Sequence, residues 1–228
     1  AMNDTSLTTL EIEPEGAARS SVIWMHGLGA DARDFEPIVP ELHLPSELGI
    51  RFVFPNAPIR PITTNGAMRM RGWYDVLSLD LPRQEDAEGV YASEQAIYQL
   101  LDREKSRGVP ADRIVLAGFS QGGAMALHAG LRYPDRLAGI LALSCYVPLA
   151  SRLSSERRPA NQTTPIFMAH GDYDAIIQIR HSQQSLELLE SLGHPVEWND
   201  YGMGHEVCWE ELRDISAWLG RVLAVSLA

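Results

Sequence analysis

Short apolar runs alternate with longer amphipathic stretches along most of this chain. The runs are rich in Val, Ile, Leu or Phe, and most have Gly or Pro close to their ends, which is typical of buried strands. The predicted strands cover residues 21–25, 51–54, 114–119, 137–145, 165–170 and 196–201. Between several of them, apolar positions recur at helical spacing, which predicts helices through residues 90–101, 186–192 and 212–222.

The alternation of strand and helix predicts an α/β fold. Strands that are apolar on both sides belong to a mostly parallel sheet with helices on both faces. No period repeats and no linker or charge block divides the 228 residues, so a single domain 1–228 is expected. It begins with an N-terminal segment, 1–16, in which Ala1 before Met2 is expected to be a cloning remnant.

Two stretches lack clear periodicity and are predicted to be long loops, residues 56–81 and 151–164. The first contains Trp73 and Tyr74, whose large side chains favour a binding role. The second, with Arg157 among its charged residues, is expected to be a solvated excursion.

Charge and cysteine content exclude several classes of partner. The net charge of −11 and the pI near 5.0 argue against nucleic acid, because phosphate backbones are bound through clustered Lys and Arg. Cys145 and Cys208 lie far apart and outside any metal-ligand spacing, which favours reduced thiols in the cytoplasm and no metal. The longest apolar stretch, 137–149, is too short and too interrupted to span a bilayer, so no integral membrane association is expected.

A G-x-S-x-G motif at residues 118–122 carries the candidate nucleophile, Ser120. A predicted strand stands before it and the small residues of a helix start follow, which is the context of a nucleophile elbow. The helix dipole and the backbone amide of Gln121 both point at an oxyanion near Ser120, so Gln121 supplies half of an oxyanion hole. The alternative is an incidental serine in a strand-to-helix turn. A phosphate-binding loop is excluded because no Lys follows the glycines.

A serine nucleophile needs a histidine base and an orienting carboxylate, which in this fold follow as Ser, Asp, His. Three histidines come late enough in the chain. His194 precedes the strand 196–201 and so lies at the wrong edge of the sheet, while His181 falls within a predicted helix. His205 follows that strand through a Gly-Met-Gly approach and is the predicted base.

Asp172 and Asp174 both follow the strand 165–170, and either could orient the base. Asp174 is preferred because it lies further into the loop, whereas Asp172 is expected to shape the turn through bonds to nearby amides. His26 ends an earlier strand in a His-Gly motif suited to building the second oxyanion amide, for which Leu28 is the expected donor.

Four motifs resemble the phospholipase/carboxylesterase family, which includes acyl-protein thioesterases. They are G-F-S-Q-G-G at 118–123, H-G-L-G at 26–29, A-L-S-C-Y-V-P-L at 142–149 and H-G-D-Y-D at 170–174, and the resemblance spans roughly residues 20 to 220. It implies an α/β-hydrolase fold without a large lid domain, and a hydrophobic acyl channel. It also implies the same site residues: the triad Ser120, Asp174 and His205, and the oxyanion amides of Leu28 and Gln121.

The resemblance also places residues 73–75 and 84–86 in the loop that walls the family's substrate channel. As a hypothesis, Trp73, Tyr146 and Ile176 line this channel, because each adjoins a catalytic loop and has no obvious place in the strand or helix pattern. Medium-length acyl chains are then expected to be preferred.

The residues predict a serine hydrolase that cleaves carboxylic esters or thioesters through an acyl-serine intermediate and needs no cofactor. The substrate is a small acyl ester or thioester, with lysophospholipids and S-acylated proteins both open. Two other functions stay open, a ligand-binding protein that uses this fold without turnover and an acyltransferase to alcohols. The oligomeric state, a homodimer included, is not determined by the sequence.

Overall fold

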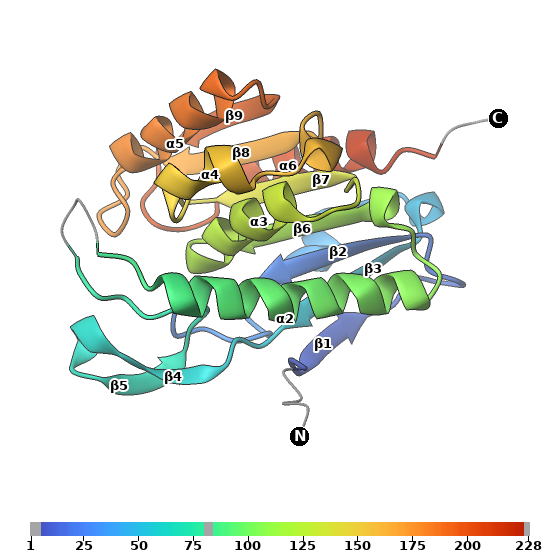
Figure 1. The fold of residues 1–228 in the computed structure, drawn as a ribbon. Coiled ribbons are helices and arrows are strands. Elements are labelled where there is room, and N and C mark those ends of the chain that lie inside the picture. Colours follow the sequence, from blue (N-terminus) through green and yellow to red (C-terminus); the bar gives the residue numbers. More distant parts are fainter. Residues whose placement is uncertain (1–5, 80–83, 226–228) are drawn as a thin grey trace.

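A computed structural model describes residues 6–79 and 84–225, and a seven-stranded sheet forms its centre (Figure 1). The strand order is β1-β3-β2-β6-β7-β8-β9, and every neighbouring pair is parallel except β1 with β3. The strands are β1 Thr9–Ile12, β2 Ser20–Met25, β3 Ile50–Pro55, β6 Ile114–Phe119, β7 Gly139–Leu143, β8 Ile166–Gly171 and β9 Val196–Tyr201. The mostly parallel sheet predicted from the apolar runs is confirmed.

Helices cover both faces of the sheet (Figure 1). The α-helices are α1 Ile38–Glu41, α2 Ala87–Ser106, α3 Gln121–Arg132, α4 Ala150–Glu156, α5 Ile179–Ser191 and α6 Trp209–Val222. In Figure 1, α2, α3, α4 and α5 lie in front of the sheet and α6 lies behind it. Short 3-10 helices connect other elements at Ser46–Leu48, Thr63–Asn65, Ala111–Arg113 and Pro159–Asn161.

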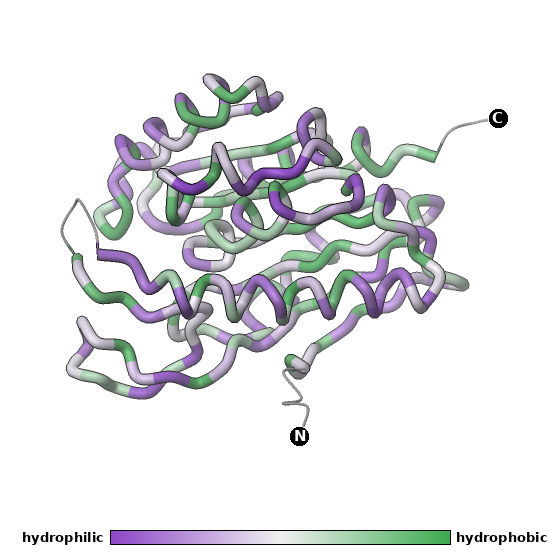
Figure 2. The backbone as a smooth tube through the Cα atoms, viewed as in Figure 1, coloured by the Kyte–Doolittle hydropathy of each residue, from purple (hydrophilic) through white to green (hydrophobic). Residues whose placement is uncertain are grey.

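The sequence of β2 explains why two helical layers are needed. All six of its residues are buried, and successive side chains point to opposite faces of the sheet. Ile23 and Met25 pack into the apolar cluster under α2 and α3, whereas Val22 and Trp24 pack into the cluster under α6. Figure 2 shows the contrast with α2, whose turns alternate between hydrophilic and hydrophobic residues because only one side of that helix meets the core.

Two predictions about irregular segments were wrong in part. The stretch 56–81 was expected to be a loop, but it contains an antiparallel hairpin of β4 Ile59–Ile62 and β5 Met68–Arg71. The last two positions of that stretch, like Ala1, lie outside the described residues. The stretch 151–164 holds most of α4 and a 3-10 helix rather than a solvated excursion.

Asn161 shows why the second stretch is ordered. Its side chain is fully buried. The amide oxygen accepts from Leu137 N at 2.9 Å, and the amide nitrogen donates to the carbonyls of Tyr133 and Asp135 at 3.0 and 2.9 Å. Because a buried polar group is stable only when its hydrogen bonds are made, these three bonds fix the segment to the start of β7.

Strand β1 was not predicted, and it pairs antiparallel with β3 at the edge of the sheet. Among the described residues, no helix has the length and apolarity that a membrane span requires.

Candidate active site

Ser120 occupies a strained turn between β6 and α3. Its backbone has φ 57° and ψ −120°, a conformation that residues with a side chain rarely adopt. The turn is held on one side by a hydrogen bond from Ser120 N to Leu143 O at 2.8 Å. Such strain costs on the order of 1–3 kcal/mol and persists only where surrounding structure enforces it. The conformation presents the serine side chain at the carboxyl edge of the sheet.

Glycines on both sides of the serine permit this turn. A Cβ on Gly118 would lie 2.2 Å from Gly122 O, and a Cβ on Gly122 would lie 2.2 Å from Met25 O. Real side chains do not approach backbone so closely. The start of α3 therefore lies directly against β2 and β6, and the glycines of the motif are required by backbone packing.

The structure brings Ser120, His205 and Asp174 together from three different strand ends. His205 Nε2 lies 3.0 Å from Ser120 Oγ, and His205 Nδ1 lies 2.6 Å from Asp174 Oδ2. The Asp174 carboxylate is fully buried, whereas the imidazole keeps 17% of its surface exposed. A buried carboxylate, an imidazole and a hydroxyl are thus linked in the order that nucleophilic catalysis uses.

The second oxygen of Asp174 shapes its own loop. Asp174 Oδ1 accepts from Ile176 N at 2.9 Å and from Ile177 N at 2.8 Å. His170 supports the same loop, since its Nε2 donates to Ile177 O at 2.7 Å and lies 3.4 Å from Asp174 Oδ2. Burial lowers the pKa of His170, so the imidazole stays neutral beside the carboxylate.

The turn-shaping role predicted for Asp172 belongs to Asp174. Asp172 is exposed and its carboxyl group faces that of Asp200 on β9. Hydrogen bonding between the two carboxyls raises the pKa of Asp172 above its ordinary value. The chain leaves β8 through backbone bonds instead, with Asp172 N donating to Tyr201 O at 2.8 Å.

His26 is a buried, neutral histidine directly after β2. Its Nδ1 donates to Gly27 O at 2.7 Å and its Nε2 accepts from Ala57 N at 3.0 Å. The side chain is almost fully buried, and burial lowers its pKa. The ring therefore ties the Gly27 turn to the segment after β3 and fixes the backbone just before Leu28.

Leu28 and Gln121 line one pocket together with Ser120. The turn around Leu28 is held by its neighbours, because Gly29 N donates to Arg71 O at 2.8 Å and Ala30 N donates to Gly27 O at 3.2 Å. Within residues 6–79 and 84–225, the backbone N–H groups of Leu28 and Gln121 make no hydrogen bond. Two unused amides beside a serine hydroxyl are what an oxyanion hole requires.

Trp73 does not line this pocket, contrary to the sequence prediction. Its side chain is fully buried, and its Nε1 donates to His26 O at 2.9 Å. Its backbone N donates to the Gln121 side chain at 2.6 Å, and that side chain in turn donates to Tyr74 O at 2.8 Å. Trp73 thus joins the end of β2, through the His26 carbonyl, to the start of α3, through the Gln121 side chain.

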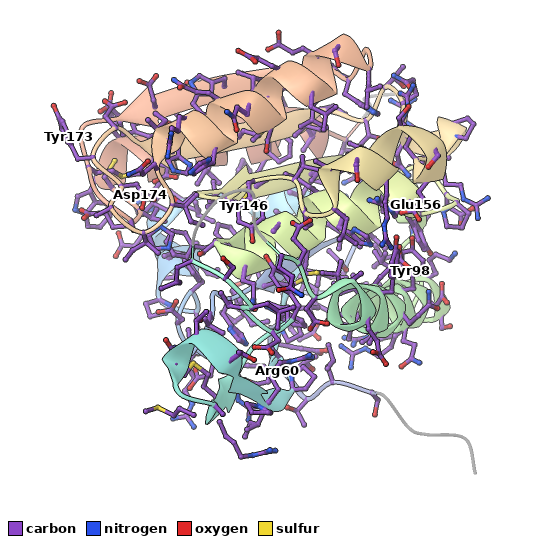
Figure 3. The ribbon with its side chains drawn as sticks, turned by 60° about the vertical axis from the view of Figure 1, so that its left-hand side comes forward. Arg60, Tyr98, Tyr146, Glu156, Tyr173 and Asp174 are labelled. Atoms are coloured by element: carbon purple, nitrogen blue, oxygen red, sulfur yellow. The ribbon has the colours of Figure 1, made fainter. Side chains whose placement is uncertain are left out.

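The pocket in front of Ser120 has a volume of about 390 Å³. Tyr146 and Ile176 both line it, and Ile176 is 68% exposed. Figure 3 shows Asp174 to the left of Tyr146, with Glu156 and Tyr98 on the opposite side. The remaining lining residues are Gly27, Leu28, Ala30, Asp34, Thr64, Asn65, Tyr74, Val76, Leu79, Phe119, Ser120, Gln121, Ile177 and His205. Much of this wall is apolar, which suits an acyl chain.

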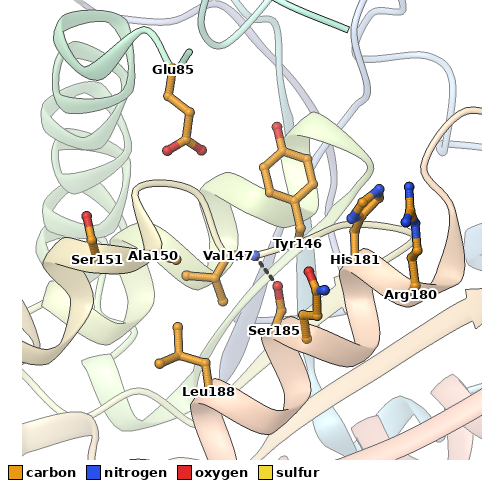
Figure 4. Close-up of a pocket in the computed structure, with 10 residues that line it drawn as sticks. Glu85, Tyr146, Val147, Ala150, Ser151, Arg180, His181, Ser185 and Leu188 are labelled. Carbon is orange, nitrogen blue, oxygen red and sulfur yellow. Dashed lines mark hydrogen bonds between the residues drawn. The ribbon is translucent and has the colours of Figure 1, made fainter. Parts of the chain in front are cut away.

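A second, larger cavity of about 570 Å³ adjoins the first, and Tyr146 lines both. The Tyr146 hydroxyl lies 2.9 Å from that of Tyr74, which fixes the ring between the two cavities. Figure 4 shows Glu85 on one side of the second cavity and Arg180 on the other. Both Glu85 carboxylate oxygens lie within reach of Leu149 N, at 3.2 and 3.0 Å.

The two rejected histidines lie outside the Ser120 pocket. His181 lines the second cavity, and His194 is buried with its Nε2 3.4 Å from an Arg157 nitrogen. What sequence reasoning missed was Asp34, which lines the pocket in a segment without periodicity or motif. Tyr74 was named only as part of the wall, and no local signal marks the hydroxyl pair that it forms with Tyr146.

Known proteins resemble this chain in sequence and in fold. The profile of the phospholipase/carboxylesterase family matches residues 9–223. The chain belongs to the phospholipase/carboxylesterase family. Acyl-protein thioesterase 1 of Neurospora crassa is 40% identical over 209 residues, which cover 88% of this chain and 85% of the relative. Acyl-protein thioesterase 1 of Mycosarcoma maydis is 36% identical over 234 residues, covering 95% and 98%.

Solved structures of other proteins have the same architecture. Arabidopsis thaliana SOBER1 matches with a TM-score of 0.86 at 32% identity, over 90% of this chain and 100% of that one. Zea mays acyl-protein thioesterase 2 matches with a TM-score of 0.83 at 28% identity, over 95% and 99%. The predicted α/β-hydrolase fold without a large lid domain is confirmed, as is the predicted enzyme class, a serine hydrolase of esters or thioesters.

Proposed function

We propose that this enzyme hydrolyses acyl thioesters and esters by transferring the acyl group to Ser120, and that its substrates include S-acylated proteins. One observation carries the proposal, the chain of hydrogen bonds from buried Asp174 through His205 to Ser120 Oγ at the wall of a partly apolar pocket. The relatives named acyl-protein thioesterase support the thioester as the bond that is cleaved.

In the first half of the reaction, His205 Nε2 takes the proton of Ser120 while Oγ attacks the carbonyl carbon. The carboxylate of Asp174 holds the other imidazole nitrogen as the N–H tautomer and stabilises the imidazolium that forms. The amides of Leu28 and Gln121 donate to the developing oxyanion, where they are worth more than in water because the site is partly closed.

In the second half, His205 gives its proton to the departing thiol or alcohol, and the acyl group stays on Ser120. A water molecule then enters beside His205. The water attacks the acyl-serine carbonyl while His205 removes a proton from the water. The acid leaves and Ser120 regains its proton. The reaction balances with water as the only co-substrate and needs no cofactor.

Labelling with a fluorophosphonate tests the nucleophile. Ser120→Ala is expected to abolish both labelling and turnover, because the probe reacts only with an activated serine. Ser151→Ala, in the neighbouring cavity, is the matched control and should be labelled like the wild type. Labelling of Ser120→Ala at another serine would overturn the assignment.

The size of the pocket bears on the acyl chain. Its volume of about 390 Å³ and its walls at Tyr146 and Ile176 support a preference for medium-length chains. Paired ester and thioester series from acetyl to palmitoyl should peak near octanoyl, and Tyr146→Ala should shift the peak. Equal effects of Tyr146→Ala on acetyl and octanoyl substrates would show that the ring makes no chain-dependent contact.

Two other proposals concern the setting of the reaction. Water is the proposed acceptor, and product analysis with added alcohol tests it, since an acyltransferase would release the alkyl ester in place of the acid. Location in the cytoplasm is supported by the two cysteines, Cys145 and Cys208, which are both free thiols. Imaging of the tagged protein at its natural expression level tests this location.

A further inference from the structure

We propose that Asp34 makes the enzyme prefer substrates whose leaving group carries a positive charge. The inference rests on the proposed function, because the leaving group is defined by attack of Ser120 on the acyl carbon. The inference concerns the leaving group of the substrate, whereas the apolar wall of the pocket contacts the acyl chain.

Asp34 is an exposed residue that lines the same pocket as Ser120 and His205. Among the described residues that line this pocket, it is the one carboxylate, and neither Lys nor Arg lines it. The other polar side chains near the mouth, Thr64 and Asn65, are neutral. The pocket therefore offers a single fixed charge to a bound substrate, and that charge is negative.

A chain of aromatic contacts links the segment that carries Asp34 to His205. The next residue, Phe35, packs its ring against Phe119 with centroids 5.4 Å apart, and Phe119 packs against His205 at 4.8 Å. His205 is the group that gives a proton to the leaving thiol or alcohol. A substituent on that thiol or alcohol is thereby directed towards the segment that carries Asp34.

Among the described residues, the carboxylate of Asp34 makes neither a hydrogen bond nor an ion pair, and its electrostatic neighbours are the His26 ring and the Asp31 carboxylate. Asp31 differs, because its Oδ1 accepts from Arg33 N at 2.8 Å. Partial burial raises the pKa of Asp34, as expected for a carboxylate that has lost water without gaining a cation. A cationic leaving group would supply the missing partner, and the net charge of −11 would attract it.

The test compares two thioesters that differ only in charge, S-octanoyl thiocholine and its neutral isostere in which tert-butyl replaces trimethylammonium. The wild type should show a kcat/KM about fivefold higher for the cation, as expected for one partly screened ion pair. Asp34→Asn should bring the two substrates to equal kcat/KM. Asp31→Asn, on the same segment but outside the pocket, should keep the preference.

Salt gives a second readout that needs no variant. The preference of the wild type should shrink as NaCl rises, because an ion pair of this exposure is screened. Equal kcat/KM values in the wild type at low salt, or a preference that survives in Asp34→Asn, would overturn the role of Asp34. Failure of the wild type to hydrolyse even the neutral thioester would instead overturn the proposed function and this inference with it.

Discussion

Two histidines follow parallel strands at the same edge of the sheet, and their partners give them different tasks. His26 ends β2 with both ring nitrogens bonded to backbone groups, those of Gly27 and Ala57. His205 follows β9 with one nitrogen against the Asp174 carboxylate and the other against Ser120 Oγ. Position relative to the sheet therefore does not decide which histidine is a base; the hydrogen-bond partners decide it.

Burial separates the two in the same way. His26 is buried, whereas His205 is half-buried. Burial strengthens the hydrogen bonds of a histidine that holds two backbone segments together, because water does not compete for them. A histidine that moves protons has to reach the substrate.

The largest loss of activity is expected from His205→Ala, because His205 is the proposed base and His26 is not. We expect kcat to fall by about 10⁶-fold, as when the base of a comparable triad is removed, with little change in Tm because the ring is partly exposed in a loop. His181→Ala, a histidine of the neighbouring cavity, serves as the control and should keep its activity. Residual activity within a factor of ten of the wild type would reject His205 as the base.

The next largest effect tests the carboxylate behind His205. Asp174→Asn can still accept from Ile176 N and Ile177 N, but it presents an amide to the imidazole and so favours the wrong tautomer. We expect kcat to fall by about 10⁴-fold at a near-native Tm. Asp172→Asn removes an exposed carboxyl that only faces Asp200, and kcat should stay close to that of the wild type. A greater loss of activity in Asp172→Asn would move the acid to that position.

His26→Ala should damage both stability and rate, but less than the triad variants damage rate. It leaves Gly27 O and Ala57 N without their partner, which costs about 1–3 kcal/mol, and it frees the Leu28 amide, which lowers kcat by about 10²-fold.

The pH dependence of the unfolding free energy of His26→Ala, compared with the wild type, checks the protonation state of His26. Burial lowers the pKa of His26 in the folded protein, so the unfolded chain binds its proton first as pH falls through the ordinary value of 6.5. The stability supplied by His26 is therefore present above pH 6.5 and is lost below it. Urea unfolding across pH should show the gap between wild type and His26→Ala narrowing in acid. A gap that widens in acid would mean that His26 is protonated in the fold.

The smallest effect concerns the far end of the His205 loop, where Glu211 accepts from Cys208 N at 3.3 Å. Burial raises the pKa of Glu211 from its ordinary 4.5 to about 8. The unfolded chain therefore loses this proton first, and stability falls as pH rises from about 4.5 to about 8. Glu211→Gln should remove this fall and leave kcat unchanged. A variant whose unfolding free energy keeps the wild-type slope over that range would show that Glu211 is ionised in the fold.

The sequence was sufficient for the central strands because burial on both faces leaves a continuous apolar run, as in β2 and β6. It was insufficient for β1, whose residues are all half-buried and include Glu11, so that no apolar run marks it. The hairpin of β4 and β5 was hidden for a similar reason, since Arg69 and Arg71 alternate with methionines in a strand that does not reach the core.

Within the site, Ser120 was predictable because it directly follows a strand in a G-x-S-x-G motif, and His205 because it follows the last strand through a Gly-Met-Gly approach. Trp73 was misassigned because its partner, His26 O, lies 47 residues away in the chain, and no local pattern records such a contact. The choice of Asp174 depended on its place further into the loop and on the family resemblance, whereas the bonds that fix its carboxylate involve backbone amides that the sequence does not display.

The segment between β3 and α2 supplies much of the pocket wall and none of the proposed catalytic groups. Thr64, Asn65, Tyr74, Val76 and Leu79 all come from it. The buried side chain of Trp73 joins this segment to the rest of the site through its hydrogen bond to His26 O. Replacing this one contiguous segment, with Trp73 kept, would therefore reshape its share of the pocket wall and leave Ser120, Asp174 and His205 in place.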